Sequence, residues 1–357
     1  MDLYLGDYNY APVKVIDNYE SFVWTERYSA YGDFTLVTQL DYYLQNLRQA
    51  EYILSSETST VMMVETVERT KDETTGAPLV KVTGRDFCAF LDNRSSKSGT
   101  SALAKVNESF TGTMSDIIRY IVFKYVADPT LAGTNAIPGF SVVNAVSPQG
   151  GSVTLNVARD TVYNMIKAMC DGMGYGFKIN RNVSAPGTLT CFIYAGIDRS
   201  DPNASYYKVY SPDDDTFFDT HSVESIANYK NHARVLGAKT GIDVYTPGIG
   251  VTPTGIARRT LVVDASDVGP DNTTTAAQDQ AVLSRRGLEA LANQQNAYMY
   301  VVDGKTPQNN WNATYFGLGD IVWVKDDVGV KTKSRITEQI WSADASGPQF
   351  SPSFTAV

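Results

Sequence analysis

The sequence has few of the residues that build disulfides and metal sites. Its 357 residues include only three cysteines and two histidines. The cysteines (Cys88, Cys170 and Cys191) are far apart and form no Cys-x-x-Cys pair, and the histidines are His221 and His232. A zinc site is therefore not predicted. The odd number of thiols, each with apolar neighbours, indicates free buried cysteines in a chain made in a reducing cytoplasm.

Long apolar runs and clustered basic residues are also missing. No stretch approaches the ~18 consecutive apolar residues of a membrane-spanning helix. The N-terminal segment MDLYLGDYNY lacks the basic start and apolar centre of a signal peptide. The net charge is −9 with scattered basic residues, which argues against a nucleic-acid-binding face. Such a balance is compatible with an acidic wall that DNA passes without binding.

No known catalytic signature is present: neither GxxxxGK[ST] nor GxSxG occurs. The glycines of GMGYG, residues 172–176, follow a predicted helix, so they indicate a helix C-cap and not a nucleotide loop. Asp213, Asp214 and Asp215 lack the spacing of a calcium loop and are interpreted as a solvated turn. His232 is interpreted as a surface or interface residue. We predict no catalytic residue, cofactor or metal, although the 39 acidic residues leave a carboxylate pair for sugar cleavage open.

Strand-forming residues are abundant. The chain has 22 Tyr and 14 Phe, and residues 11–84 form successive alternating segments separated by turn residues. The polar tip at 70–78 predicts a long hairpin between 60–70 and 79–84. Strands return after residue 205 and include three near the C-terminus. A helix is expected over 274–294, with a buried face made of small and apolar residues (Ala277, Ala281, Leu288 and Leu291).

The middle of the chain has helical periodicity. Residues 113–126 begin with Thr113 and Asp116 at capping-box spacing. A second helix ends near Gly174 and is followed by a hairpin, whereas 127–153 is expected to be mostly loop. We therefore predict an α+β, mainly β fold. Its parts are a first β-domain (1–98), an inserted α+β domain (99–204), and a second β-portion (205–357) that packs back on the first.

The stretch VKVTGRDFCAFLDNR, residues 80–94, changes abruptly from strand to helix. We expect Gly84 to end the strand with a positive φ, Arg85 to tie the turn to neighbouring groups, and Asp86 to cap the helix. GLGDIVWV is expected to form a second corner of the same kind, at Gly319 and Asp320. These five residues are predicted to be structural corners.

The order of these segments carries a resemblance. A β-meander leads into GRDF, and an α+β insertion, the YKN strand, RRTLVVDASD, a helix with LEALA, GLGD and a closing hairpin follow. This order resembles the tail hub family of long-tailed phages, similar to the contractile-phage baseplate hub. The resemblance implies two tail-tube-like β-barrel domains per subunit and a homotrimer on the hexameric distal tail ring.

The resemblance also implies a function. A hub closes the distal end of the tail tube at the virion tip, contacts the tape measure protein and tip or fibre proteins, and has a channel for DNA without sequence-specific binding. Many relatives carry a C-terminal hydrolase, whereas this chain ends at FSPSFTAV, so no enzymatic activity is expected. Two alternatives stay open: a receptor- or cell-wall-binding tail protein, suggested by the tyrosines, and a peptidoglycan hydrolase with its site inside 99–200.

Overall fold

The computed structural model describes most of the chain, namely residues 1–48, 50–72, 75–96, 108–147, 151–157, 160–203, 206–246, 252–269, 275–292, 299–307 and 317–357. Strands outnumber helices, and the predicted α+β, mainly β class is confirmed. The chain forms two compact units: residues 1–221 with 302–357, and residues 222–301. The predicted boundaries at 98/99 and 204/205 stay a prediction.

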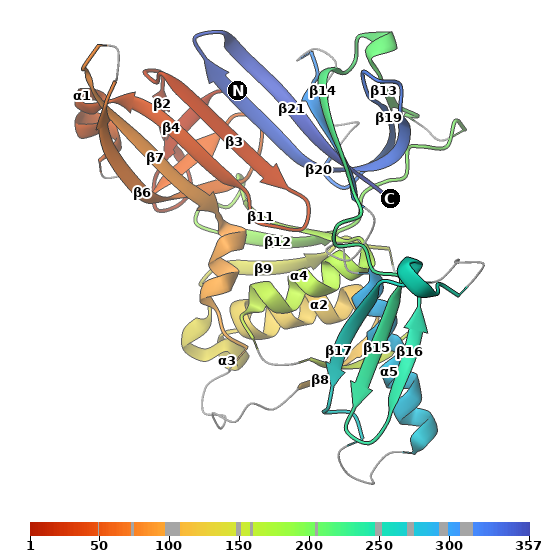
Figure 1. Ribbon diagram of the computed structural model, residues 1–357. Helices are drawn as coiled ribbons and strands as arrows, with labels where there is room; N and C mark the ends of the chain where they lie inside the picture. Colours follow the sequence, from red (N-terminus) through yellow and green to blue (C-terminus); the bar gives the residue numbers. More distant parts are fainter. Residues whose placement is uncertain are drawn as a thin grey trace. The chain divides into compact units, whose positions relative to one another are not determined.

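The first unit is built around a large sheet to which both ends of the chain contribute (Figure 1). The strand order is β14-β18-β21-β20-β3-β4-β7-β6-β5-β1-β2, and β19 joins it by pairing with β20 and with β13. Its strands are β1 (Leu3–Gly6), β2 (Pro12–Ile16), β3 (Ser21–Arg27), β4 (Asp33–Gln39), β5 (Tyr52–Ser55), β6 (Val61–Lys71), β7 (Pro78–Asp86), β13 (Val209–Tyr210), β14 (Phe218–Ser225), β18 (Met299–Lys305), β19 (Ile321–Lys325), β20 (Lys331–Asp344) and β21 (Gly347–Ala356).

This sheet is an open path among the described strands, because its terminal strands β14 and β2 do not pair with each other. The two predicted barrels are therefore not shown. The predicted β6–β7 hairpin is present, and β20 pairs antiparallel with β3 so that Trp341 lies opposite Trp24. Strands from the two ends of the chain thus share one core.

Strand β21 was not predicted. Two prolines, Pro348 and Pro352, interrupt its sequence, and proline argues against a strand between two partners because it lacks an N–H donor. Phe350 and Phe354 are nevertheless buried on β21, which pairs with β20 along its length. Burial of these aromatic side chains outweighs the local signal.

The α+β part of the first unit has two helices, α2 (Met114–Val122) and α4 (Val162–Met173). They lie against a three-stranded sheet in the order β11-β12-β9 (Figure 1). Thr113 accepts a hydrogen bond from a backbone N–H at the start of α2 and Gly174 caps the end of α4, as predicted. Thr161 caps the start of α4 in the same way, and Gly174 adopts the left-handed conformation. The remaining bounds are β8 (Glu108–Gly112), β9 (Phe140–Asn144), β10 (Val153–Val157), β11 (Gly176–Arg181), β12 (Leu189–Tyr194), α1 (Leu40–Tyr42) and α3 (Pro129–Ala132).

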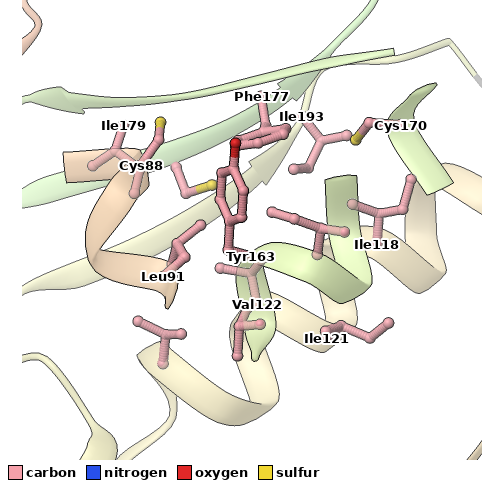
Figure 2. Close-up of a cluster of buried hydrophobic side chains, with 14 of the residues drawn as sticks. Cys88, Leu91, Ile118, Ile121, Val122, Tyr163, Cys170, Phe177, Ile179 and Ile193 are labelled. Atoms are coloured by element: carbon pink, nitrogen blue, oxygen red, sulfur yellow. The ribbon is translucent and has the colours of Figure 1, made fainter. Parts of the chain in front are cut away.

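The core of this part joins the helices to the sheet. Figure 2 shows Tyr163 of α4 between the side chains of α2 and those of the strands, with Cys88 and Phe177 nearby. All three cysteines are free and buried, as the sequence indicates. The segment 127–153 was expected to be loop with at most short strands: β9 is such a strand, whereas the short helix α3 was not expected.

The second unit is a three-stranded sheet with one helix. Its elements are β15 (His232–Gly237), β16 (Gly241–Tyr245), β17 (Thr260–Ala265) and α5 (Ala276–Ala292). The expected buried face of α5 was wrong except for Leu291: Leu283, Gly287 and Leu291 are buried, whereas the other predicted positions (Ala277, Ala281 and Leu288) are exposed. A Cβ on Gly287 would lie 2.7 Å from a Val244 methyl carbon, so this glycine lets the helix approach the sheet.

Within the described ranges, the helices are too short or too polar to span a membrane.

Candidate functional site

The first predicted corner lies where β7 meets the 3₁₀ helix Phe87–Asn93. The Asp86 side chain is buried, and its Oδ1 accepts a hydrogen bond from the Cys88 N–H at 2.8 Å. Its Oδ2 accepts a second bond from the Gly32 N–H at 2.7 Å. Asp86 therefore caps the helix, as expected, and also fastens it to the connection between β3 and β4.

Gly84 does not adopt the positive φ that we expected, and this part of the prediction was wrong. Gly84 lies opposite Val64, where the register between β6 and β7 shifts in a bulge. A Cβ on Gly84 would lie 1.7 Å from the carbonyl oxygen of Met63. Glycine is required here because two backbones approach closely, not because of its φ.

Arg85 points to the partly exposed side of the same corner. Its Nε and one terminal nitrogen donate to the two carboxylate oxygens of Glu65 at 2.8 and 2.7 Å. The guanidinium carbon also lies 5.0 Å from the centre of the Tyr31 ring. Pairing with Glu65 raises the pKa of Arg85, so the guanidinium stays charged.

The electrostatic setting of Asp86 is unusual. Burial raises the pKa of its carboxyl group from the ordinary 3.8 to about 7, and the charge of Glu26 acts in the same direction. The two backbone N–H donors favour the ionised form, but desolvation outweighs them. No cation contacts Asp86 among the described residues.

The second predicted corner lies at the start of β19. Gly319 has a φ of +92°, and the Asp320 side chain is buried. Asp320 Oδ1 accepts from the Ile197 N–H at 2.8 Å, and Oδ2 accepts from Arg199 Nε at 2.6 Å. The Arg199 and Asp320 side chains are 8% and 6% exposed, so this is a buried ion pair. Asp320 thus joins β19 to the segment after β12.

Tyr28 joins several loops at this corner, and no local motif points to it. Its hydroxyl donates to the Gly174 carbonyl at 2.9 Å and accepts from the Gly196 N–H at 3.1 Å. A Cβ on Gly319 would lie 2.1 Å from the Tyr28 ring. The Arg335 guanidinium lies 5.3 Å from the ring centre and donates to the Gly319 carbonyl. The glycine is therefore needed both for its φ and for this contact.

The two corners border one cavity of about 420 Å³ in the first unit. Asp86 and Asp320, far apart in the sequence, both contribute to its lining. Other lining residues come from β3, the loop before β6, β11, the segment after β12, and β20: Glu26, Arg27, Glu57, Thr58, Ser59, Thr60, Phe177, Lys178, Asn180, Tyr194, Ala195, Gly196, Ile197, Arg199, Gly317, Leu318 and Gln339. The cavity, which sequence reasoning missed, is the candidate functional site.

Other residues considered from the sequence lie outside this site. Asp213 lies in a short 3₁₀ turn, where Ser211 accepts from its N–H and its own carboxylate accepts from Lys325 at 2.6 Å. His232 is fully buried between Arg258 and Thr260, so it is not a surface residue, and the other part of its interpretation, an interface residue, stays a prediction. Among the residues that the structure describes, no group of three or more His, Cys, Asp or Glu is placed to hold a metal ion.

Comparison with known proteins identifies the family. Residues 1–354 match the sequence pattern of the Siphovirus ReqiPepy6 Gp37-like proteins. The chain belongs to this family. No curated protein sequence matches it.

Solved structures share the fold over nearly the whole chain. A 43 kDa tail protein of prophage MuSo2 from Shewanella oneidensis has a TM-score of 0.60 at 15% identity, covering 99% of this chain and 98% of its own. The tail protein from Neisseria meningitidis MC58 has a TM-score of 0.57 at 12% identity, covering 99% and 95%. Prophage tail protein gp18 from Listeria monocytogenes has a TM-score of 0.53 at 11% identity, and the match covers 99% of this chain and 94% of gp18. These likenesses show a shared fold, and with the family match they confirm the predicted resemblance to phage tail proteins.

Proposed function

We propose that the chain is a structural component of a phage tail and acts as the hub that closes the distal end of the tail tube. The observation that carries this proposal is the family match over residues 1–354 together with a fold shared with prophage tail proteins over 99% of the chain. A likeness of this extent involves the whole arrangement of elements and not one widespread domain.

The hub is a homotrimer that docks coaxially on the hexameric distal tail ring. It contacts the tape measure protein and tip or fibre proteins and leaves an axial channel for DNA. Residues 1–98 and 205–357 supply the two tube-like halves, and 99–204 is the insertion. The pairing of β20 with β3 supports the packing of the last portion back on the first, and residues 222–301 fold as a compact unit within that last portion.

The exposed end of the large sheet supports a closed ring. Strand β2 ends the path of described strands, and its residues 12–15 are all exposed. Val13 is 69% exposed and Val15 is 48% exposed. An apolar edge strand of this kind is covered in stable proteins, and a ring of identical subunits provides such a cover.

The test is a reconstruction of assembled tails, made without imposed symmetry. Three copies around an axial channel at the tip are expected. Six copies, or one copy attached to the side of the tail, would contradict the hub assignment. Isolated chains in dilute solution are not a substitute, because ring contacts can depend on the partner ring.

The proposed role needs no enzymatic activity, and the alternative is a peptidoglycan hydrolase with its site inside 99–200. Zymography of the purified chain on peptidoglycan tests this directly, and no cleared band is expected. A cleared band that disappears on substitution of one carboxylate within 99–200 would establish the hydrolase instead.

A further inference from the structure

The cavity shared by the two corners has the shape of a binding site. Its rim includes exposed residues such as Glu57, Lys178 and Ile197, whereas Phe177 and Gln339 in its floor are buried. A volume of about 420 Å³ lies within the range of small-molecule sites, ~300–1,000 Å³, and far exceeds the ~30 Å³ share of one water.

The walls of this cavity contain polar atoms that the described part of the protein leaves without hydrogen-bond partners. They are the Asn180 Oδ1, the Tyr194 hydroxyl oxygen and the Gln339 Nε2, and all three are buried. Buried polar groups are satisfied in the great majority of proteins, so three in one lining indicate a further molecule. The terminal torsions of Asn and Gln are broad, and a Tyr hydroxyl hydrogen rotates freely, so a ligand in the cavity can be met by rotation of the two amides and reorientation of this hydrogen.

The chemistry of the three atoms is mixed. Gln339 Nε2 can only donate, Asn180 Oδ1 can only accept, and the Tyr194 hydroxyl can do both. A hydroxyl-bearing ligand meets all three needs, because each hydroxyl group donates one hydrogen bond and accepts others. A simple cation would satisfy only the acceptors, and a simple anion would satisfy only the donors.

The charges of the lining argue against an anionic ligand. Four carboxyl groups (Glu26, Glu57, Asp86 and Asp320) face three cations (Arg27, Lys178 and Arg199). Arg199 is paired with Asp320, and Arg27 is paired with Asp33 and Glu338 outside the lining. Glu26 lies opposite Gln339 in the β3–β20 ladder, which adds a charged acceptor next to the unpartnered amide. With these pairs set aside, three carboxyl groups (Glu26, Glu57 and Asp86) face Lys178 alone, so the lining disfavours an anionic ligand.

We propose that this cavity binds one small neutral polyhydroxyl compound, of the class of a monosaccharide or the terminal sugar of a glycan chain. The amides of Asn180 and Gln339 and the hydroxyl of Tyr194 contact its hydroxyl groups, and Phe177 forms the apolar floor. This binding site does not depend on the hub assignment, and either can fail while the other holds.

The experiment is saturation-transfer NMR and calorimetric titration of the full chain with glucose, galactose, rhamnose, N-acetylglucosamine and glycerol. A second arm uses soluble glycan chains that end in these sugars, which separates a free sugar from a polymer end as the source. Binding of at least one of these probes at a single site is expected.

Two variants connect the binding to this cavity. Tyr194→Phe and Gln339→Leu remove unpartnered groups, so no hydrogen bond within the described protein is lost and the fold should persist, as checked by thermal melting. Each should weaken binding about tenfold, the effect of one hydrogen bond of typical strength. Tyr8→Phe is the control, since the Tyr8 side chain is 80% exposed and lies outside the lining, and its affinity should equal that of the wild type.

The proposal fails if none of the sugars, glycerol or glycan chains binds the wild type. Ordered water would then be the occupant of the cavity. It also fails if the bound sugar keeps its affinity in both Tyr194→Phe and Gln339→Leu, because the site would then lie elsewhere.

Discussion

Two buried aspartates, one at each corner, are held in different ways. Asp86 is held by two backbone N–H groups without a cation, whereas Asp320 is held by Arg199 and by two backbone N–H groups. Without a cation, burial raises the pKa of Asp86 to about 7. The comparison shows that a buried aspartate at a corner can be held by backbone donors alone, with a raised pKa, or as one half of a buried ion pair. Substitutions at the two corners distinguish the role of Asp86 from that of Asp320.

The largest effect is expected at the ion pair. Arg199→Met leaves Asp320 buried without its cation and should lower the free energy of unfolding by about 3–5 kcal/mol. Urea denaturation followed by circular dichroism measures this. Lys325→Met is the matched control, because its partner Asp213 is exposed and screened by solvent, so the loss should be much smaller than for Arg199→Met. Equal losses in the two variants would show that the buried pair contributes no more than a surface pair.

The next effect is the pH dependence of Asp86. Its folded-state pKa of about 7 lies above the ordinary value of 3.8, so the folded chain binds this proton more tightly than the unfolded chain. The resulting stabilisation is complete below pH ~4 and is lost as the pH rises through ~7, by about 2–4 kcal/mol in total.

The measurement compares urea denaturation of the wild type and Asp86→Asn between pH 4.5 and 7.5. The wild type should lose stability across this window, and the variant should lose much less. Carboxyl groups whose pKa is lowered, such as Asp198 at about 2, change stability at lower pH and do not interfere. Parallel curves for the two proteins would show that Asp86 is already ionised at pH 4.5.

Substitution of the glycine at each corner by alanine should lower the stability of the fold, but for different reasons at the two corners. Gly84→Ala introduces a clash with a backbone oxygen at an ordinary φ, whereas Gly319→Ala combines a clash with Tyr28 and a φ of +92°. Each should cost about 1–3 kcal/mol. Gly329→Ala is the control, because Gly329 has the same φ with open space around it and isolates the conformational cost of about 1 kcal/mol.

Melting temperatures of the three glycine variants provide the test. If Gly84→Ala melts like the wild type, the close approach of β6 and β7 is not rigid. If Gly319→Ala equals Gly329→Ala, the contact with Tyr28 carries no cost.

The smallest effect is expected at Arg85. Arg85→Lys keeps the charge but loses the two-pronged contact with Glu65, and the pair is about one-third exposed on each side. The loss should be below about 1 kcal/mol by urea denaturation. A larger loss would show that the contact of Arg85 with the Tyr31 ring stabilises the corner substantially.

Local features of the sequence determined much of the secondary structure. The caps of α2 and α4, the β6–β7 hairpin and the helix cap at Asp86 depend on residues within a few positions of each other or on simple alternation, so they could be predicted. The ordered set of segments also indicated the phage tail resemblance, which the family match confirms.

The tertiary structure alone decided the rest. β21 forms despite two prolines because its aromatic residues are buried against partners far away in the chain: Phe354 contacts Tyr210 and Phe217, and Phe350 lies in the core with Phe22 and Trp24. α5 turns its Gly287 face to the sheet because close approach there outweighs the small residues on its other side. Arg199 and Asp320 are 121 positions apart, and Tyr28 and Gly196 are 168 apart, so no local pattern reveals their contacts. The cavity between the corners exists only where these distant segments meet, because long-range packing and burial energy, not local propensity, place them together.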